Sequence, residues 1–170
     1  MWISQKTNFN AFELDELFWF VKRKSRSETR ANAFVMTMIS REPRQIVAFD
    51  VDTSVNAPCI QRMVDSVVPA RNYFTDGCSV YRGVDFVGRL RQNFCDKNDT
   101  HIIESTNADL RHYIAGLARR SRTFFRKLET KRNVLSVFVN AYNKFGEAKM
   151  GYIRKDKRRK ELPFSILDFL

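Results

Sequence analysis

Three acidic residues, spread widely along the chain, lie in sequence contexts where a carboxylate could take part in chemistry. Asp15 lies in FELDELFWF, Asp76 in YFTDGCSVY and Glu104 in THIIESTNADLR. An ionised carboxylate in an apolar strand such as the first is unfavourable unless it is paired or bound to a metal ion. Carboxylate oxygens are the ligands that Mg²⁺ prefers. The three acids therefore indicate a metal centre able to act on phosphodiesters.

The rest of the chain is strongly basic. Its 170 residues include 30 lysines and arginines against 19 aspartates and glutamates, which gives a formal net charge of +11. Such a balance favours phosphate polymers or anionic membrane surfaces as partners. Metal-binding carboxylates within a basic protein are typical of enzymes that cut nucleic acid, so nucleic acid is the expected partner.

Other features favour one domain in a reducing cytoplasmic setting. No apolar run approaches the roughly 20 residues that span a bilayer, and the first residues, MWISQKTNFN, do not resemble a signal peptide. The cysteines, Cys59, Cys78 and Cys95, are widely spaced and form no C-x-x-C motif. They predict neither a zinc ribbon nor a disulfide framework.

Hydrophobic periodicity and turn residues predict mixed secondary structure. The expected strands are 12–21, 33–40 and 45–52 as antiparallel hairpins, then 71–75 ending at Asp76, with a candidate fifth strand in 84–90. The expected helices run from Pro58 to before Pro69, over 77–81, onward from Ile102, and over about 128–145 to an end near Gly146. In the third of these helices Ile103, Leu110, Ile114 and Leu117 form one apolar stripe. Glu104, Asn107 and Arg111 share another face.

Three antiparallel strands followed by alternating helices and short strands is the order of a ribonuclease H-like domain, an α/β fold. The acid-bearing motifs, together with VFVNAYNKFG, resemble the DDE transposases of bacterial insertion sequences, of the insertion-sequence-one type and its relatives. The resemblance extends from about Phe12 to Gly146, and its most specific part is the I-E-x-x-N-x-x-L-R run at 103–111. It implies a catalytic domain over 1–146 and a basic and apolar tail over 147–170.

The resemblance also implies the site and its partners. Asp15, Asp76 and Glu104 would be the catalytic acids and would hold two Mg²⁺ ions, with Mn²⁺ as a substitute. The expected activity is metal-dependent DNA cleavage and strand transfer during transposition, by an oligomer on DNA in a bacterial cytoplasm. The expected DNA contacts are Asn107, Arg111, Arg119, Arg120 and Arg122. Because the chain has no Cys/His cluster of the kind that reads element ends, a separate end-binding protein or domain is an expected partner.

Several alternatives stay open at this level. Asp50 and Asp52, on one face of IVAFDVD, rival Asp15 as the first acid. Glu13 shares the strand face of Asp15, whereas Glu16 points to the other face and is not expected to be a ligand. Eight cations between residues 111 and 132 are opposed only by Glu129, which favours phosphate contact. Those cations are Arg111, Arg119, Arg120, Arg122, Arg126, Lys127, Lys131 and Arg132.

The alternative functions are another ribonuclease H-like nuclease, such as a junction resolvase, or an inactive DNA-binding remnant of an insertion element. Strand joining separates a transposase from a nuclease. Metal-dependent cleavage separates both enzymes from the remnant.

Overall fold

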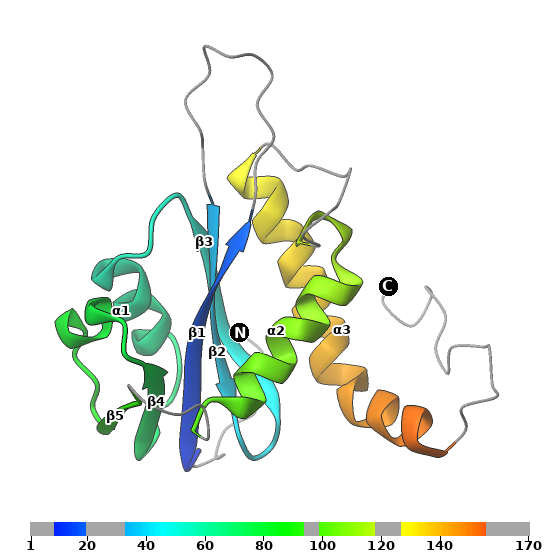
Figure 1. Ribbon diagram of the computed structural model, residues 1–170, viewed down its shortest axis with the longest axis horizontal. Coiled ribbons are helices and arrows are strands. Elements are labelled where there is room, and N and C mark those ends of the chain that lie inside the picture. The colour runs from blue at the N-terminus through cyan, green and yellow to red at the C-terminus, as the bar shows by residue number, and fades with distance from the viewer. Residues whose placement is uncertain (1–8, 20–32, 94–98, 118–126, 156–170) are drawn as a thin grey trace.

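A computed structural model of the chain describes residues 9–19, 33–93, 99–117 and 127–155. In these residues a five-stranded sheet is flanked by helices on both faces, an α/β arrangement (Figure 1). The strands are β1 (Ala11–Trp19), β2 (Ala33–Ser40), β3 (Gln45–Asp52), β4 (Asn72–Asp76) and β5 (Arg89–Asn93). The helices are α1 (Ala57–Asp65), α2 (His101–Tyr113) and α3 (Leu128–Lys155), with short 3₁₀ turns η1 (Ser79–Gly83) and η2 (Ala115–Leu117).

The sheet has the strand order β3-β2-β1-β4-β5. β1, β2 and β3 pair antiparallel, whereas β4 pairs parallel to β1 and β5 parallel to β4. The contact between β1 and β4 is short, because only Ala11–Glu13 pair with Asn72–Phe74. β4 ends at Asp76 while β1 continues to Trp19. The second half of β1 therefore extends past the end of its neighbour.

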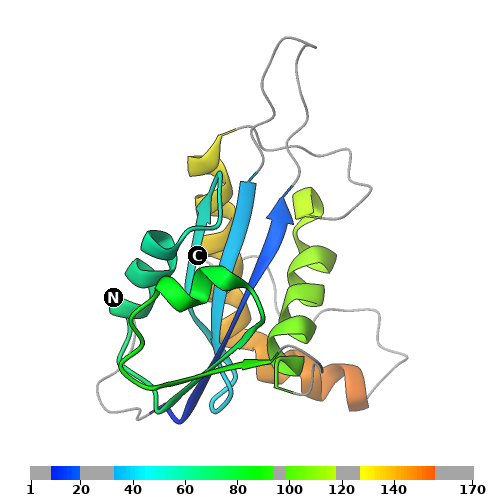
Figure 2. The same cartoon turned by 60° about the vertical axis from the view of Figure 1, so that its left-hand side comes forward.

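Side chains of β1 alternate between two separate cores. Phe12 and Leu14 are buried in the cluster that contains α1 and η1 residues. Leu17 and Trp19 are buried in the cluster built with α2 and α3. Figures 1 and 2 show α1 and η1 on one side of the sheet and α2 and α3 on the other. A residue of β1 thus faces one helical layer or the other according to its position in the alternation.

The start of each short helix has an identifiable cause. Asn56 caps α1, and its side-chain oxygen accepts a 2.9 Å hydrogen bond from the Cys59 N–H. The side chain of Thr100 makes no capping hydrogen bond for α2. Instead Glu13 Oε2, reaching from β1, accepts a 2.8 Å bond from the Ile103 N–H. The carboxylate at this helix start also suits the positive end of the helix dipole.

The expected strands at 33–40 and 45–52, and their antiparallel pairing, are confirmed. β5 lies at Arg89–Asn93, so it overlaps only the end of the expected 84–90 segment. The expected end of the last helix near Gly146 is wrong, since α3 continues to Lys155. One interior glycine costs a helix only about 1 kcal/mol, which does not stop a helix of this length. The division of the chain after residue 146 therefore falls inside α3 and stays a prediction.

Candidate metal centre

Three carboxylates meet where β1 passes the end of β4. Asp15, Glu16 and Asp76 each place one carboxylate oxygen within 4.8 Å of the other two. Asp15 and Glu16 are half-buried, and Asp76 is exposed. The group is therefore open to solvent on the Asp76 side and enclosed on the β1 side.

Strand geometry explains how neighbouring residues join one site. Asp15 and Glu16 point to opposite faces of the sheet, because side chains alternate along a strand. Asp76 is the last residue of β4, at the point where that strand no longer covers β1. One oxygen of Asp76 accepts a 2.9 Å hydrogen bond from the Cys78 N–H, which holds the carboxylate at the strand end. From there it reaches both Asp15 and Glu16 around the uncovered edge of β1.

On the α2 side, a buried amide holds Asp15. Asn107 Nδ2 donates a 2.6 Å hydrogen bond to Asp15 Oδ2, and Asn107 is only 2% exposed. Its Oδ1 accepts a 3.3 Å bond from Thr37 Oγ1 on β2. Burial raises the pKa of Asp15, as do the charges of Asp76 and Glu104, while the Asn107 amide acts in the opposite direction.

On the η1 side, Glu16 lies beside the buried phenol of Tyr81. Burial, followed by smaller contributions from the charges of Asp15 and Asp76, raises the pKa of Glu16 to about 7, although Tyr81 lowers it. The pKa of the Tyr81 phenol is itself raised, first by burial and then by Glu16. Glu16 Oε1 is buried and has no hydrogen-bond partner within the part of the chain that the structure describes. Repelling carboxylates with an unsatisfied oxygen form an arrangement that a divalent cation would stabilise.

The structure brings two of the three predicted acids together. Asp15 and Asp76 share the cluster, whereas Glu104 lies on α2 outside the group of three. Glu104 is one helical turn before Asn107 and close enough to Asp15 for its charge to raise the Asp15 pKa. The sequence placed Glu16 outside the site. It correctly assigned Glu16 to the opposite face, but nothing in it indicated that β4 stops early enough for the carboxylates to meet.

Glu13, on the same strand face as Asp15, has a supporting role. It is fully buried, and its Oε1 accepts a 2.7 Å bond from Arg41 Nε while its Oε2 caps α2. Arg41 also donates a 2.6 Å bond to the Asp99 carbonyl and lies 3.8 Å above the Phe74 ring. This pair joins the β2–β3 turn to the start of α2. It thereby helps to fix the helix that carries Asn107 and Glu104.

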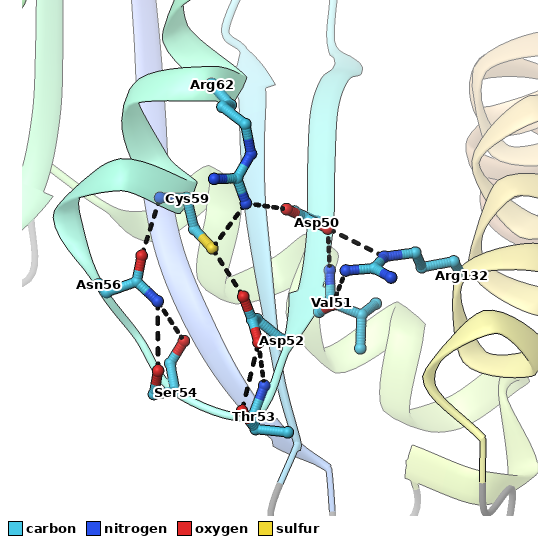
Figure 3. A network of polar contacts seen from close by, with 9 residues as sticks. All are labelled: Asp50, Val51, Asp52, Thr53, Ser54, Asn56, Cys59, Arg62 and Arg132. Atoms are coloured by element: carbon cyan, nitrogen blue, oxygen red, sulfur yellow. Dashed lines mark hydrogen bonds and ion pairs between the residues drawn. The ribbon is translucent and has the colours of Figure 1, made fainter.

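Asp50, the alternative candidate for the first catalytic acid, forms ion pairs away from the three-carboxylate cluster. It lies on β3 at the sheet edge, where Arg62 of α1 and Arg132 of α3 approach its two oxygens at 3.3 and 3.2 Å (Figure 3). Asp52 accepts a 2.9 Å bond from Cys59 Sγ, and this bond is the main reason that the pKa of Asp52 is lowered. Neither acid is in the cluster of three. Their contacts join both helical layers to the edge strand.

Several of the expected DNA contacts have other environments. Asn107 is buried, and both ends of its amide are used inside the protein, so it serves Asp15 rather than phosphate. Lys131 is fully buried with its Nζ 5.6 Å from the Trp19 ring centroid, and Arg132 pairs with Asp50. Asn107 and Lys131 are therefore too buried to line a phosphate-binding face, whereas phosphate contact by Arg132, whose side chain is 45% exposed, stays a prediction. Arg111 is half-buried on α2. Arg119, Arg120, Arg122 and Arg126 lie outside the described residues.

Comparison with known proteins does not identify the chain. Neither a protein-family model nor a curated protein matches its sequence. Within the residues that the structure describes, no helix has the length and apolar character needed to cross a membrane.

Proposed function

We propose that this chain is the catalytic domain of a DDE transposase with a ribonuclease H-like fold. The observation that carries the proposal is the meeting of Asp15 and Asp76 beside the end of β4 in a chain of net charge +11. The strand order β3-β2-β1-β4-β5, with the first three strands antiparallel and the last two parallel to β1, supports it. So does the position of Glu104 on α2, near enough to act electrostatically on Asp15.

The residues of the site fit a divalent cation through the chemistry of their donors. Carboxylate oxygens are hard ligands, and the buried orphan oxygen of Glu16 lies in the same group. Asp15, Asp76 and Glu104 would hold two Mg²⁺ ions, with Mn²⁺ as a substitute. When bound, such ions supply Lewis-acid stabilisation of charge on the attacking and leaving oxygens of a phosphodiester.

The protein's own groups position the reaction. Asp76, which is exposed, is the acid that a DNA strand would approach first. Asn107 orients Asp15 through their 2.6 Å hydrogen bond. Arg111 and the arginines at 119, 120 and 122 would hold the DNA backbone, since contacts with phosphates need charge rather than sequence. The partners would be element-end and target DNA and an end-binding protein, in an oligomer assembled on DNA in a bacterial cytoplasm.

The decisive experiment is a cleavage and strand-transfer assay on element-end DNA with Mg²⁺ or Mn²⁺ and the end-binding partner. Asp15→Asn, Asp76→Asn and Glu104→Gln should each abolish both steps while folding and DNA binding are retained. Each change removes a negative ligand but keeps the shape of the side chain. Asp50→Asn is the matched control and should remain active.

The outcomes separate the candidate functions. Cleavage without joining would identify a nuclease, and inactivity of the wild-type protein would identify a remnant. Strand transfer by Asp76→Asn at the wild-type rate would refute the assignment of the acids.

A further inference from the structure

The roles proposed above leave Glu16 without a function. Among the described residues, its Oε1 is buried without a hydrogen-bond partner. Its acidic neighbours, Asp15 and Asp76, repel it. A buried, unsatisfied carboxylate oxygen beside two other carboxylates costs free energy unless a cation or proton compensates it.

We propose that Glu16 is a ligand of a divalent cation held on the η1 side of Asp15 and Asp76, whereas Glu104 serves a position on the α2 side. The inference rests on the proposed metal centre and adds a fourth carboxylate to it. Asp15 and Asp76 would be shared by both positions, as carboxylates are in two-metal sites.

The geometry supports this arrangement. Because Asp15 and Glu16 are adjacent on β1, their carboxylates approach Asp76 from opposite faces of the sheet. Asn107 holds Asp15 from the α2 side, the side on which Glu104 also lies. Glu16 lies with η1 on the other side, so one carboxylate is available beyond Asp15 on each face.

The spacing of the oxygens suits one ion. Ligand oxygens around Mg²⁺ at about 2.1 Å can be at most about 4.2 Å apart, and those around Ca²⁺ at about 2.5 Å can be about 5 Å apart. One carboxylate oxygen from each of Asp15, Glu16 and Asp76 lies within 4.8 Å of the other two.

Tyr81 is the positioning residue for Glu16. Its ring is 1% exposed and packs in the α1-side core, which fixes the phenol beside the Glu16 carboxylate. The phenol lowers the pKa of Glu16, and Glu16 raises the pKa of Tyr81, so the two groups interact directly. Tyr81→Phe removes the hydroxyl while retaining the ring in the core.

The test is direct Mn²⁺ binding by the full chain, measured from the electron paramagnetic resonance signal of free Mn²⁺. In Glu16→Gln, one binding position should weaken at least tenfold, and a different position should weaken in Glu104→Gln. Tyr81→Phe should weaken the Glu16-dependent position about tenfold, as loss of a supporting contact does, while the protein keeps a cooperative unfolding transition in EDTA. Glu42→Gln, at an exposed acid in the β2–β3 turn, removes the same charge and should bind Mn²⁺ like the wild type.

Two results would overturn the inference. One is Mn²⁺ binding by Glu16→Gln that equals binding by Glu42→Gln. The other is loss of the same position in Glu16→Gln and Glu104→Gln. If Asp15→Asn and Asp76→Asn still lose Mn²⁺ in either case, the proposed function stands without Glu16. If those two variants also bind like the wild type, the proposed metal centre itself is refuted.

Discussion

Asn107 Nδ2 lies 2.6 Å from Asp15 Oδ2, so a buried amide on α2 holds an acid that is 92 positions earlier in the chain. The Thr37 hydroxyl lies 3.3 Å from Asn107 Oδ1 and 3.4 Å from the Asp15 carbonyl oxygen, so its single proton is within reach of both acceptors. Helix α2, strand β2 and strand β1 are thereby joined at the candidate metal centre. The orientation of Asp15 depends on the docking of the helix as much as on its own strand.

Asn107→Ala should lower both stability and metal affinity. It removes a hydrogen bond to a charged group, which is worth about 1.5–3 kcal/mol of unfolding free energy. Loss of a residue that orients a ligand should weaken Mn²⁺ binding about 10- to 100-fold. Urea denaturation and Mn²⁺ titration measure the two effects. Thr37→Val, which removes only the longer bonds, should have smaller effects on both. Unchanged Mn²⁺ affinity in Asn107→Ala would contradict the role assigned to Asn107.

Glu16→Gln should change how stability depends on pH. The folded-state pKa of Glu16, about 7, lies above its ordinary value of 4.5. The folded protein therefore binds the proton more tightly, and this group lowers stability as pH rises from about 4.5 to 7, with no further change above. Glu16→Gln should match the wild type near pH 4 and exceed its unfolding free energy above pH 7 by at most about 3 kcal/mol. Denaturant unfolding in EDTA across this range is the measurement. A constant difference between the two proteins would contradict it.

Arg41→Ala should destabilise the protein strongly. It leaves Glu13, which is fully buried, without its ion-pair partner. Breaking such a pair from one side costs about 2–4 kcal/mol here, since Arg41 is itself 25% exposed. The control is Arg44→Ala, because Arg44 joins the same turn to α2 through the hydroxyls of Ser105 and Thr106. Its loss should cost about 1 kcal/mol. Equal melting temperatures for the two variants would show that the Glu13 pair is not the stronger link.

Asp50→Asn should reduce stability slightly and leave Mn²⁺ binding intact. Its arginine partners, Arg62 and Arg132, are 61% and 45% exposed, so solvent screens both ion pairs. A loss of about 1 kcal/mol in unfolding free energy is expected. Loss of Mn²⁺ affinity comparable to that of Asp15→Asn would make Asp50 the first acid instead.

The chain should bind duplex DNA with little sequence preference and with a steep dependence on salt. Replacing Arg119, Arg120 and Arg122 by Ala should reduce the slope of log K against log salt by about 2–3, if each contacts one phosphate. The matched control replaces Arg71, Arg89 and Arg91, which are exposed and carry the same total charge. Fluorescence anisotropy at several salt concentrations measures the slopes. Equal changes in the two triple variants would indicate that only net charge matters.

Much of the fold could be predicted from local pattern. The strands at 33–40 and 45–52 have β-forming residues bounded by turn signals, and Pro58 marks the first turn of α1. These are short-range preferences of the backbone and side chains, so the sequence determined them. The prediction that the last helix ends near Gly146 is wrong, because one glycine is a weak stop signal compared with the cumulative hydrogen bonding of a long helix.

The sequence also determined which residue types could bind metal, and it placed Asp15 and Asp76 at strand positions. Only the tertiary structure decided which carboxylates meet. Glu16 joins the cluster because β4 stops at Asp76 and uncovers the edge of β1, a consequence of strand order and strand length. Asp50 is not part of the carboxylate cluster, because an arginine of α1 and an arginine of α3 pair with it instead. The alternation of side chains along a strand is local and can be predicted from the sequence. Which carboxylates converge in space depends on long-range packing, which no single segment encodes.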